Sequence, residues 1–237
     1  MSKIIAIANQ KGGVGKTTTS INLAACLAVA EKKTLIVDLD PQGNASVGLG
    51  LEKLNFVKAN IYHAMIGEEN IENCIYETDL PCLDICPSDN NLIGAEVELM
   101  QAMARESKLK NALESIHDKY DYVLIDCPPS LSLLTLNGLN SANSYIVPMQ
   151  TEYYAMEGLA QLLNTVNLIK QNLNPDLEIE GILLTMYDGR NNLSKLVAEE
   201  IQNTFPEDTF KTIVPRNVKL SESPSHGKPI ITYDITS

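Results

Sequence analysis

The sequence lacks any apolar run of the roughly 18 residues that a membrane-spanning helix needs. Its first 20 residues pass from a strand-like segment into a loop rich in Gly and Thr. They have neither the apolar core nor the cleavage site of a signal peptide. We therefore expect a cytoplasmic protein without a membrane partner.

The sequence also lacks the cysteine spacing typical of disulfide-rich or zinc-binding proteins. Its cysteines are five in number, which is odd, and no two of them form a CxxC pair. This argues against a disulfide framework and against a zinc site. The three histidines are scattered and suit surface positions better than metal ligation. We expect reduced, mostly buried thiols at Cys26, Cys74, Cys82, Cys86 and Cys127.

Basic residues are scarce, since 18 Lys and Arg stand against 30 Asp and Glu, for a formal net charge of −12. That balance argues against a constitutively basic nucleic-acid binder. With 44% hydrophobic residues in 237, the chain can bury roughly 70–75% of its unfolded surface. We predict one domain over residues 1–237, without internal repeats or a long linker.

Short apolar runs rich in β-branched residues alternate with longer segments of helical spacing. The predicted strands are 4–8, 34–37, 83–86, 122–125, 145–147, 179–186 and 212–214, and the predicted helices are 17–30, 94–117, 157–173 and 193–205. The alternation predicts an α/β fold, with a mostly parallel twisted sheet covered by helices on both faces. Ligand-binding loops are then expected at the carboxyl ends of the strands.

A glycine-rich loop follows the first predicted strand and leads into a helix. This order brings backbone N–H groups and the positive end of a helix dipole to one point, as a polyphosphate requires. With ATP or ADP as the expected ligand, Lys16 is expected to neutralise the β-phosphate and, in ATP, the γ-phosphate, and the Thr17 hydroxyl to bind Mg²⁺. The expected nucleotide-binding residues are Lys11, Gly12, Gly13, Val14, Gly15, Lys16, Thr17 and Thr18.

Carboxylates follow two other predicted strands. Asp38 and Asp40 are two residues apart, so on an extended strand both would point to the same side. One could lie near a metal while the other orients a water molecule. The run 122–126 ends in Asp126 and is followed by two prolines, a pattern typical of a Walker B strand. Asp126 is expected to hold Mg²⁺ through water.

The loop resembles that of the deviant Walker A ATPases, whose KGGxGKT pattern matches residues 11–17 at every fixed position. The resemblance implies an ATP-dependent homodimer in which Lys11 reaches across the interface to the other subunit's nucleotide. A cation supplied in this way stabilises transition-state charge only when two loaded subunits meet. The resemblance also implies that Asp40 positions the attacking water and that Asp38 belongs to the shell around Mg²⁺.

Motifs along nearly the whole chain are similar to the ParA/Soj branch of this family, the ATPases that segregate chromosomes and plasmids. These motifs lie at 38–44, 126–130, 152–158 and 214–229. The resemblance implies a dimer that binds double-stranded DNA without sequence preference and associates with the nucleoid. It also implies a ParB-type partner that stimulates hydrolysis, and contacts from Pro215 and Asn217 to the adenine.

The distribution of charge bears on the DNA-binding prediction. Residues 187–228 contain six basic and six acidic residues, so the remainder of the chain carries the whole −12. The relative gathering of basic residues suits a local phosphate-contacting patch. By similarity to the family we expect Arg190 and Lys219 to contact DNA, and solvated surface charge is the alternative for both.

Relatives continue beyond the segment corresponding to 233–235 with a final helix, which this chain is expected to lack. The alternatives are a MinD-like membrane-associated switch, which needs a C-terminal amphipathic helix, and an iron–sulfur carrier, which needs cysteines placed to bridge a cluster. A protein that holds ATP without hydrolysing it is a further alternative, and Asp40 argues against it.

Overall fold

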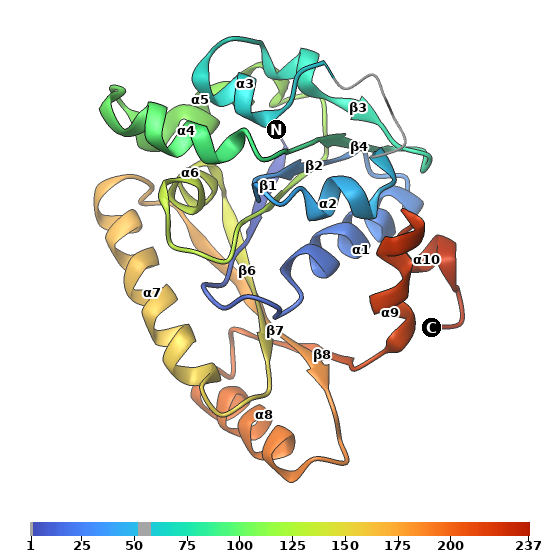
Figure 1. Cartoon of the computed structure of the whole chain (residues 1–237). Coiled ribbons are helices and arrows are strands. Elements are labelled where there is room, and N and C mark those ends of the chain that lie inside the picture. The colour runs from blue at the N-terminus through green and yellow to red at the C-terminus, as the bar shows by residue number, and fades with distance from the viewer. Residues whose placement is uncertain (1, 52–57) are drawn as a thin grey trace.

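The computed structural model describes residues 2–51 and 58–237. Its strands form one twisted sheet in the order β3-β4-β2-β5-β1-β6-β7-β8 (Figure 1). All neighbouring strands pair in parallel except β3, which is antiparallel to β4. The strands are β1 (Lys3–Ile7), β2 (Thr34–Asp38), β3 (Tyr76–Glu77), β4 (Leu83–Cys86), β5 (Tyr122–Asp126), β6 (Ser144–Gln150), β7 (Glu178–Tyr187) and β8 (Thr209–Pro215).

Helices cover both faces of this sheet, which confirms the predicted fold class (Figure 1). The α-helices are α1 (Lys16–Val29), α2 (Asn44–Gly48), α3 (Ile61–Ile66), α4 (Leu92–Glu98), α5 (Lys108–Leu113), α6 (Leu133–Ser141), α7 (Ala155–Asn172), α8 (Asn192–Thr204), α9 (Val218–Glu222) and α10 (Ile230–Tyr233). Short 3-10 helices are η2 (Ile71–Cys74), η3 (Leu99–Gln101), η4 (Arg105–Ser107), η5 (Glu114–Ile116) and η6 (Ser223–His226).

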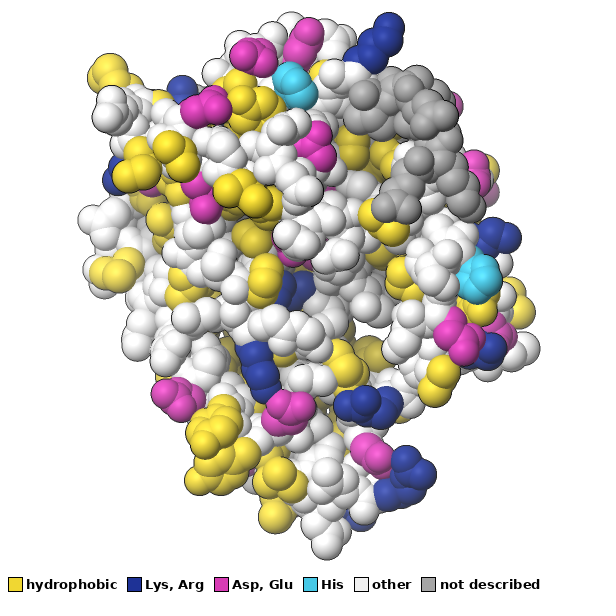
Figure 2. Space-filling model, in the orientation of Figure 1, with side chains coloured by type: hydrophobic (Ala, Val, Ile, Leu, Met, Phe, Trp, Pro, Cys, Tyr) yellow, Lys and Arg dark blue, Asp and Glu magenta, His cyan; other side chains and the backbone are white. Residues whose placement is uncertain are grey.

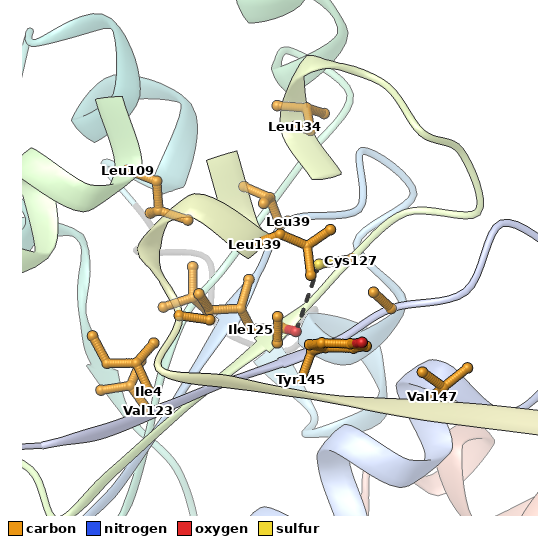
Figure 3. Packing of buried hydrophobic residues seen from close by; sticks show 14 of the residues in the cluster. Ile4, Leu39, Leu109, Val123, Ile125, Cys127, Leu134, Leu139, Tyr145 and Val147 are labelled. Atoms are coloured by element: carbon orange, nitrogen blue, oxygen red, sulfur yellow. Dashed lines mark hydrogen bonds between the residues drawn. The ribbon is translucent and has the colours of Figure 1, made fainter. Parts of the chain in front are cut away.

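The central strands are buried on both faces, as continuous apolar runs in a parallel sheet require. Successive residues of β1 face opposite sides, so that Ile4 and Ala6 pack beneath one helical layer and Ile5 and Ile7 beneath the other. In the larger core, Leu39, Cys127 and Leu139 lie next to one another where α6 packs against β5 (Figure 3).

All seven predicted strands are confirmed, with small differences at their ends. The predicted helix 94–117 is wrong, because the segment divides into α4, η3, η4, α5 and η5. The break has a tertiary cause in α6. Asn137 Nδ2 donates to the carbonyl oxygen of Arg105 at 2.9 Å, and Asn140 Nδ2 donates to that of Glu106 at 2.7 Å. Because the two asparagine side chains supply hydrogen bonds to these carbonyl oxygens, the carbonyls do not depend on partners in a continuous helix.

The prediction of mostly buried thiols holds for Cys74, Cys86 and Cys127, whereas Cys26 and Cys82 are exposed. Cys82 precedes β4 and has a φ of 66°, so it belongs to a turn and not to the strand.

The order of the sheet determines where its ligand-binding loops meet. The chain passes from β1 to strands on one side, and after β5 it crosses β1 to build β6, β7 and β8 on the other side. The carboxyl end of β1 therefore lies at the topological switch point, where open α/β sheets bind their ligands.

Candidate functional site: a nucleotide-binding loop and its carboxylates

The loop between β1 and α1 has the backbone conformation that its glycines allow. Gly13 and Gly15 have φ values of 72° and 89°, in the left-handed region that glycine enters without strain. The loop is tied to the sheet because Thr185 Oγ1, on β7, donates to the carbonyl oxygen of Val14 at 2.8 Å. The side chain of Asn9 also accepts from Lys11 N at 2.9 Å. These two hydrogen bonds hold the loop against β7 and against the segment that follows β1.

A cavity of about 510 Å³ opens beside the first turn of α1. Gly13, Gly15, Lys16, Thr17 and Thr18 form one wall. Residues far away in the sequence also contribute to the lining, among them Asp40, Gln42, Asn44, Pro129, Met186, Pro224 and Lys228. The positive end of the α1 dipole faces an anion placed there.

Lys16 is the buried cation of this cavity, whereas Lys228 is exposed. The residue is only 6% exposed, and its Nζ donates to the carbonyl oxygen of Lys11 at 3.0 Å. Burial lowers the pKa of Lys16, and this effect is opposed mainly by the negative charge of Asp126. No ion pair with a carboxylate is recorded for it within the described residues, so its charge is available to an anion.

Asp126 ends β5 and is fully buried. Its Oδ1 accepts from Ser20 Oγ at 2.8 Å, whereas Oδ2 has no hydrogen-bond partner in the part of the chain that the structure describes. Burial raises the pKa of Asp126, Asp38 raises it further, and the hydroxyls of Thr17 and Ser20 oppose both effects. An unsatisfied buried carboxylate oxygen beside Thr17 fits Mg²⁺ or its bound water.

The described residues hold no cluster of three or more His, Cys, Asp or Glu side chains that could bind a metal ion alone. A Mg²⁺ site at a bound nucleotide takes one or two carboxylates from the protein and completes its shell with substrate phosphates and water.

Asp38 and Asp40 lie at and just beyond the carboxyl end of β2, and their common orientation stays a prediction. The strand ends at Asp38, and the chain then turns, with Asp38 Oδ1 accepting from Asp40 N at 3.2 Å. Asp38 Oδ2 accepts from Ser46 N and Ser46 Oγ at 2.9 and 2.7 Å. Burial raises the pKa of Asp38. Asp40 lines the cavity, whereas Asp38 is buried behind it and fixes the turn that presents Asp40.

Lys11 lies at the other end of the loop, outside the lining of the cavity. Its side chain is 40% exposed and forms an ion pair with Glu152, which follows β6. Within one chain, Lys11 is therefore directed at Glu152 and not at the phosphate-binding wall.

A second, largely apolar cavity of about 610 Å³ adjoins the first, and both include Gly15, Thr18 and Met186 in their lining. Pro215 and Asn217, the residues expected at the adenine, line this second cavity. Asn217 also begins α9, with its Oδ1 accepting from Lys219 N at 2.7 Å, while its Nδ2 donates to Ser237 Oγ at 2.6 Å.

The two expected DNA contacts lie at the surface and are paired with carboxylates. Arg190 binds Asp188 through two hydrogen bonds of 3.0 and 2.9 Å, and Lys219 binds Glu222 at 2.9 Å. Four other basic residues of 187–228 are exposed, and no ion pair is recorded for them among the described residues: Lys195, Lys211, Arg216 and Lys228.

Several residues of the site carry no motif that the sequence alone reveals. Ser20 and Thr185 contribute ordinary hydroxyls, and only their hydrogen bonds to Asp126 and to the loop identify them. Met186 has an unusual φ of 50° and lines both cavities. Glu152 lies within a recognisable motif, but its pairing with Lys11 spans 141 positions.

A strand, a glycine loop with a buried lysine at the start of a helix, and a buried aspartate on a neighbouring strand define a P-loop NTPase. Residues 2–179 match the family described as an AAA domain. The chain is 55% identical to the sporulation initiation inhibitor protein Soj of Bacillus subtilis, over 99% of this chain and 92% of that protein. It is also 55% identical to the chromosome partitioning protein ParA of Myxococcus xanthus, over 100% of this chain and 83% of that protein.

Among solved structures, cobyrinic acid a,c-diamide synthase from Mycobacterium smegmatis with bound ADP and magnesium has a TM-score of 0.86 at 36% identity. The similarity covers 96% of this chain and 91% of that one. The chain belongs to the ParA/Soj family of partitioning ATPases. Among its described residues, no helix combines the length and the apolar character needed to cross a membrane.

Proposed function

We propose that this chain is a Mg²⁺-dependent ATPase that dimerises with ATP, binds DNA as the dimer, and partitions a chromosome or plasmid with a ParB-type partner. The observation that carries the proposal is the presence of two buried charged side chains at the loop, Lys16 and Asp126. Among the described residues, Lys16 Nζ is bonded to a carbonyl oxygen and to no carboxylate, and Asp126 Oδ2 has no hydrogen-bond partner. A magnesium-bound polyphosphate supplies the missing partner to each.

The two adjoining cavities suit the two ends of a nucleotide. The polar cavity has the loop, Lys16 and Thr17 in its wall, and these residues would hold the phosphates and Mg²⁺. The apolar cavity has Pro215 and Asn217 in its lining, where a base can be buried. ADP and ATP share these contacts, so both are expected to bind.

Hydrolysis needs a water molecule held in line with the γ-phosphate, and Asp40 is the carboxylate in position to orient it. It lines the polar cavity and is 7% exposed. Mg²⁺ would neutralise charge on the phosphates. Lys16 would stabilise the charge that develops in the transition state, as preorganised cations do.

In a dimer, Lys11 of each subunit would act on the nucleotide of the other subunit. In the single chain its ammonium is held by Glu152, away from the cavity, so this chain's own phosphate site lacks that cation. A second subunit placed face to face would bring its Lys11 to the γ-phosphate. This requirement makes a single chain a slow enzyme, since one stabilising charge is absent until two loaded subunits meet.

DNA binding by the dimer follows from the exposed basic residues of 187–228. Each chain is acidic overall, so one patch binds phosphates weakly. Two patches on one dimer bind more strongly through effective concentration. Arg190 and Lys219 would exchange their carboxylate partners for phosphates. The dimer would then associate with the nucleoid, and a ParB-type partner would stimulate hydrolysis and release it.

Nucleotide binding is tested by calorimetry with ATP in the presence and absence of Mg²⁺. We expect the unaltered chain to bind ATP more tightly with Mg²⁺. Lys16→Ala should abolish binding, because a buried cation at the phosphates is lost. Lys110→Ala changes an exposed lysine of α5 and should bind as the unaltered chain does. Retained affinity in Lys16→Ala would refute the site.

A further inference from the structure

A stripe of exposed apolar side chains runs along α4 and η3. Ile93, Val97 and Met100 follow at spacings of four and three residues, so they lie on one helical face. They are 53%, 68% and 61% exposed, and Met103, just beyond, is 91% exposed. Hydrophobic side chains are visibly gathered over α4 (Figure 2). Contiguous exposed apolar surface of this kind marks an interaction site.

A cavity of about 320 Å³ adjoins the stripe, between η3 and the start of α6. Met100, Leu133 and Leu136 supply its apolar walls. Glu96 Oε1 and Ser132 Oγ are buried polar atoms of its lining, and neither has a hydrogen-bond partner among the residues described. Because an unpaired buried carboxylate oxygen is costly, the cavity is suited to a hydrogen-bond donor from outside.

The charges around the cavity indicate that this donor is a cation. Arg105 also lines the cavity, but its Nε donates to Glu106 Oε1 at 2.9 Å and its Nη1 to the carbonyl oxygen of Met100 at 2.8 Å. Glu96 Oε1 has no such partner within residues 2–51 and 58–237. A lysine or arginine can place its aliphatic stem against Met100 and the two leucines, with its charged head at Glu96.

We propose that α4, η3 and the start of α6 form a docking groove for a helical segment of a partner protein that carries one Arg or Lys on its apolar face. The stripe receives the apolar residues of that helix, and the cavity receives the cation. Methionines suit such a surface because their flexible side chains adapt to the shape of an incoming helix. The unpaired carboxylate disfavours anionic lipid and nucleic acid as occupants.

The groove includes the start of α6, the helix that follows the loop after Asp126. Ser132 and Leu133 begin α6 only a few residues after Asp126, and Thr135 Oγ1 donates to the carbonyl oxygen of Ser130 at 2.6 Å. A docked partner therefore contacts the helix next to the proposed metal site. The binding itself requires no nucleotide, so its test is independent of the proposed ATPase cycle.

The absence of tryptophan from the chain gives a direct assay. A synthetic helical peptide with leucines and one arginine on its apolar face, neutral polar residues elsewhere and one tryptophan reports its own binding by fluorescence. Glu96→Gln should weaken binding about tenfold or more, because a charge-assisted hydrogen bond is lost. Glu98→Gln, on the same helix, removes an equal charge from an exposed carboxylate engaged by Tyr62. It should change binding by less than about twofold.

A second peptide, with norleucine in place of arginine, should bind at least about tenfold more weakly than the first. Equal losses in Glu96→Gln and Glu98→Gln would overturn the proposal, because the attraction would then be general charge. Should Glu96→Gln fail to fold, Met103→Ser alters a residue that is 91% exposed. We expect it to weaken binding of the first peptide, and unchanged binding would contradict the groove.

Two other occupants are distinguished with the same variants. Phosphatidylglycerol vesicles are added to the unaltered chain and to Met103→Ser, and we expect neither to bind them. The nucleotide-free chain is also sedimented, and we expect a monomer. Vesicle binding lost in Met103→Ser would identify the stripe as a lipid surface, and a dimer dissociated by Met103→Ser would identify a second copy. Either result would overturn the proposal.

Discussion

Lys11 and Lys16 belong to the same loop but differ in their surroundings, and this difference predicts a separate role for each. Lys16 is buried at the start of α1, beside the carboxylates of Asp126 and Asp40. Lys11 is 40% exposed and reaches an acidic side chain at the surface. A buried cation can hold phosphate within its own chain, whereas an exposed cation is free to exchange one partner for another.

Removing Lys11 should therefore separate dimerisation from nucleotide binding. We expect Lys11→Ala to bind ATP with an affinity near that of the unaltered chain, yet to sediment as a monomer with ATP. Glu152→Gln is the matched control, since it frees Lys11 from its ion pair and should leave the ATP-dependent dimer intact. An intact dimer in Lys11→Ala would exclude the contact in trans.

Asp40 should matter for hydrolysis and not for binding. In Asp40→Ala we expect an ATP-bound dimer whose phosphate release is slower by about 10²-fold or more, the usual effect of losing a group that orients or deprotonates the nucleophile. Asp79→Ala, at an exposed turn, serves as the control and should hydrolyse ATP normally. If Asp40→Ala turned over at the normal rate, another residue would have to orient the water.

At the scale of elements, the packing of α6 against the sheet is tight at Gly138. A Cβ atom there would lie 2.9 Å from Cys127 Sγ and 3.4 Å from both Ile125 Cγ2 and Leu39 Cδ2. Gly138→Ala should destabilise the protein by about 1–3 kcal/mol, the usual cost of overpacking a core. The measurement is chemical unfolding monitored by circular dichroism.

The matched control is Gly158→Ala in α7, where nothing lies within 4 Å of the added Cβ. Alanine has the higher helix propensity, so this change should stabilise the protein by up to about 1 kcal/mol. Equal effects of the two substitutions would show that α6 can shift away from β5, contrary to the packing described.

Sequence patterns predict a helix or strand correctly when the residues that determine it lie within that element. Strand β5 is five residues with an apolar run, all but its first buried, and its prediction is confirmed. The break in 94–117 depends on Asn137 and Asn140, more than 30 positions away, and no helical periodicity contains that information.

The site was predictable to a similar extent. Five residues of the predicted loop lie together with Asp40 in one cavity: Gly13, Gly15, Lys16, Thr17 and Thr18. Ser20, Met186 and the Lys11–Glu152 pair were not predicted, because each depends on contacts between distant segments.

At the scale of the whole molecule, charge and assembly are linked. The formal charge of −12 opposes DNA binding by a single chain, while six basic residues lie in 187–228. Two of these, Arg190 and Lys219, are paired with neighbouring carboxylates, which weakens one patch further. DNA affinity should therefore depend strongly on the number of patches brought together, and hence on the bound nucleotide.

We propose that ATP switches the molecule from a form that releases DNA to a form that holds it. The direct measurement is retention of nonspecific double-stranded DNA with ADP, ATP or a slowly hydrolysed ATP analogue, over a series of salt concentrations. We predict retention with ATP and with the analogue, little with ADP, and a logarithmic affinity that falls linearly with the logarithm of salt concentration. Equal retention with all three nucleotides, or none with ATP and the analogue at low salt, would contradict the account.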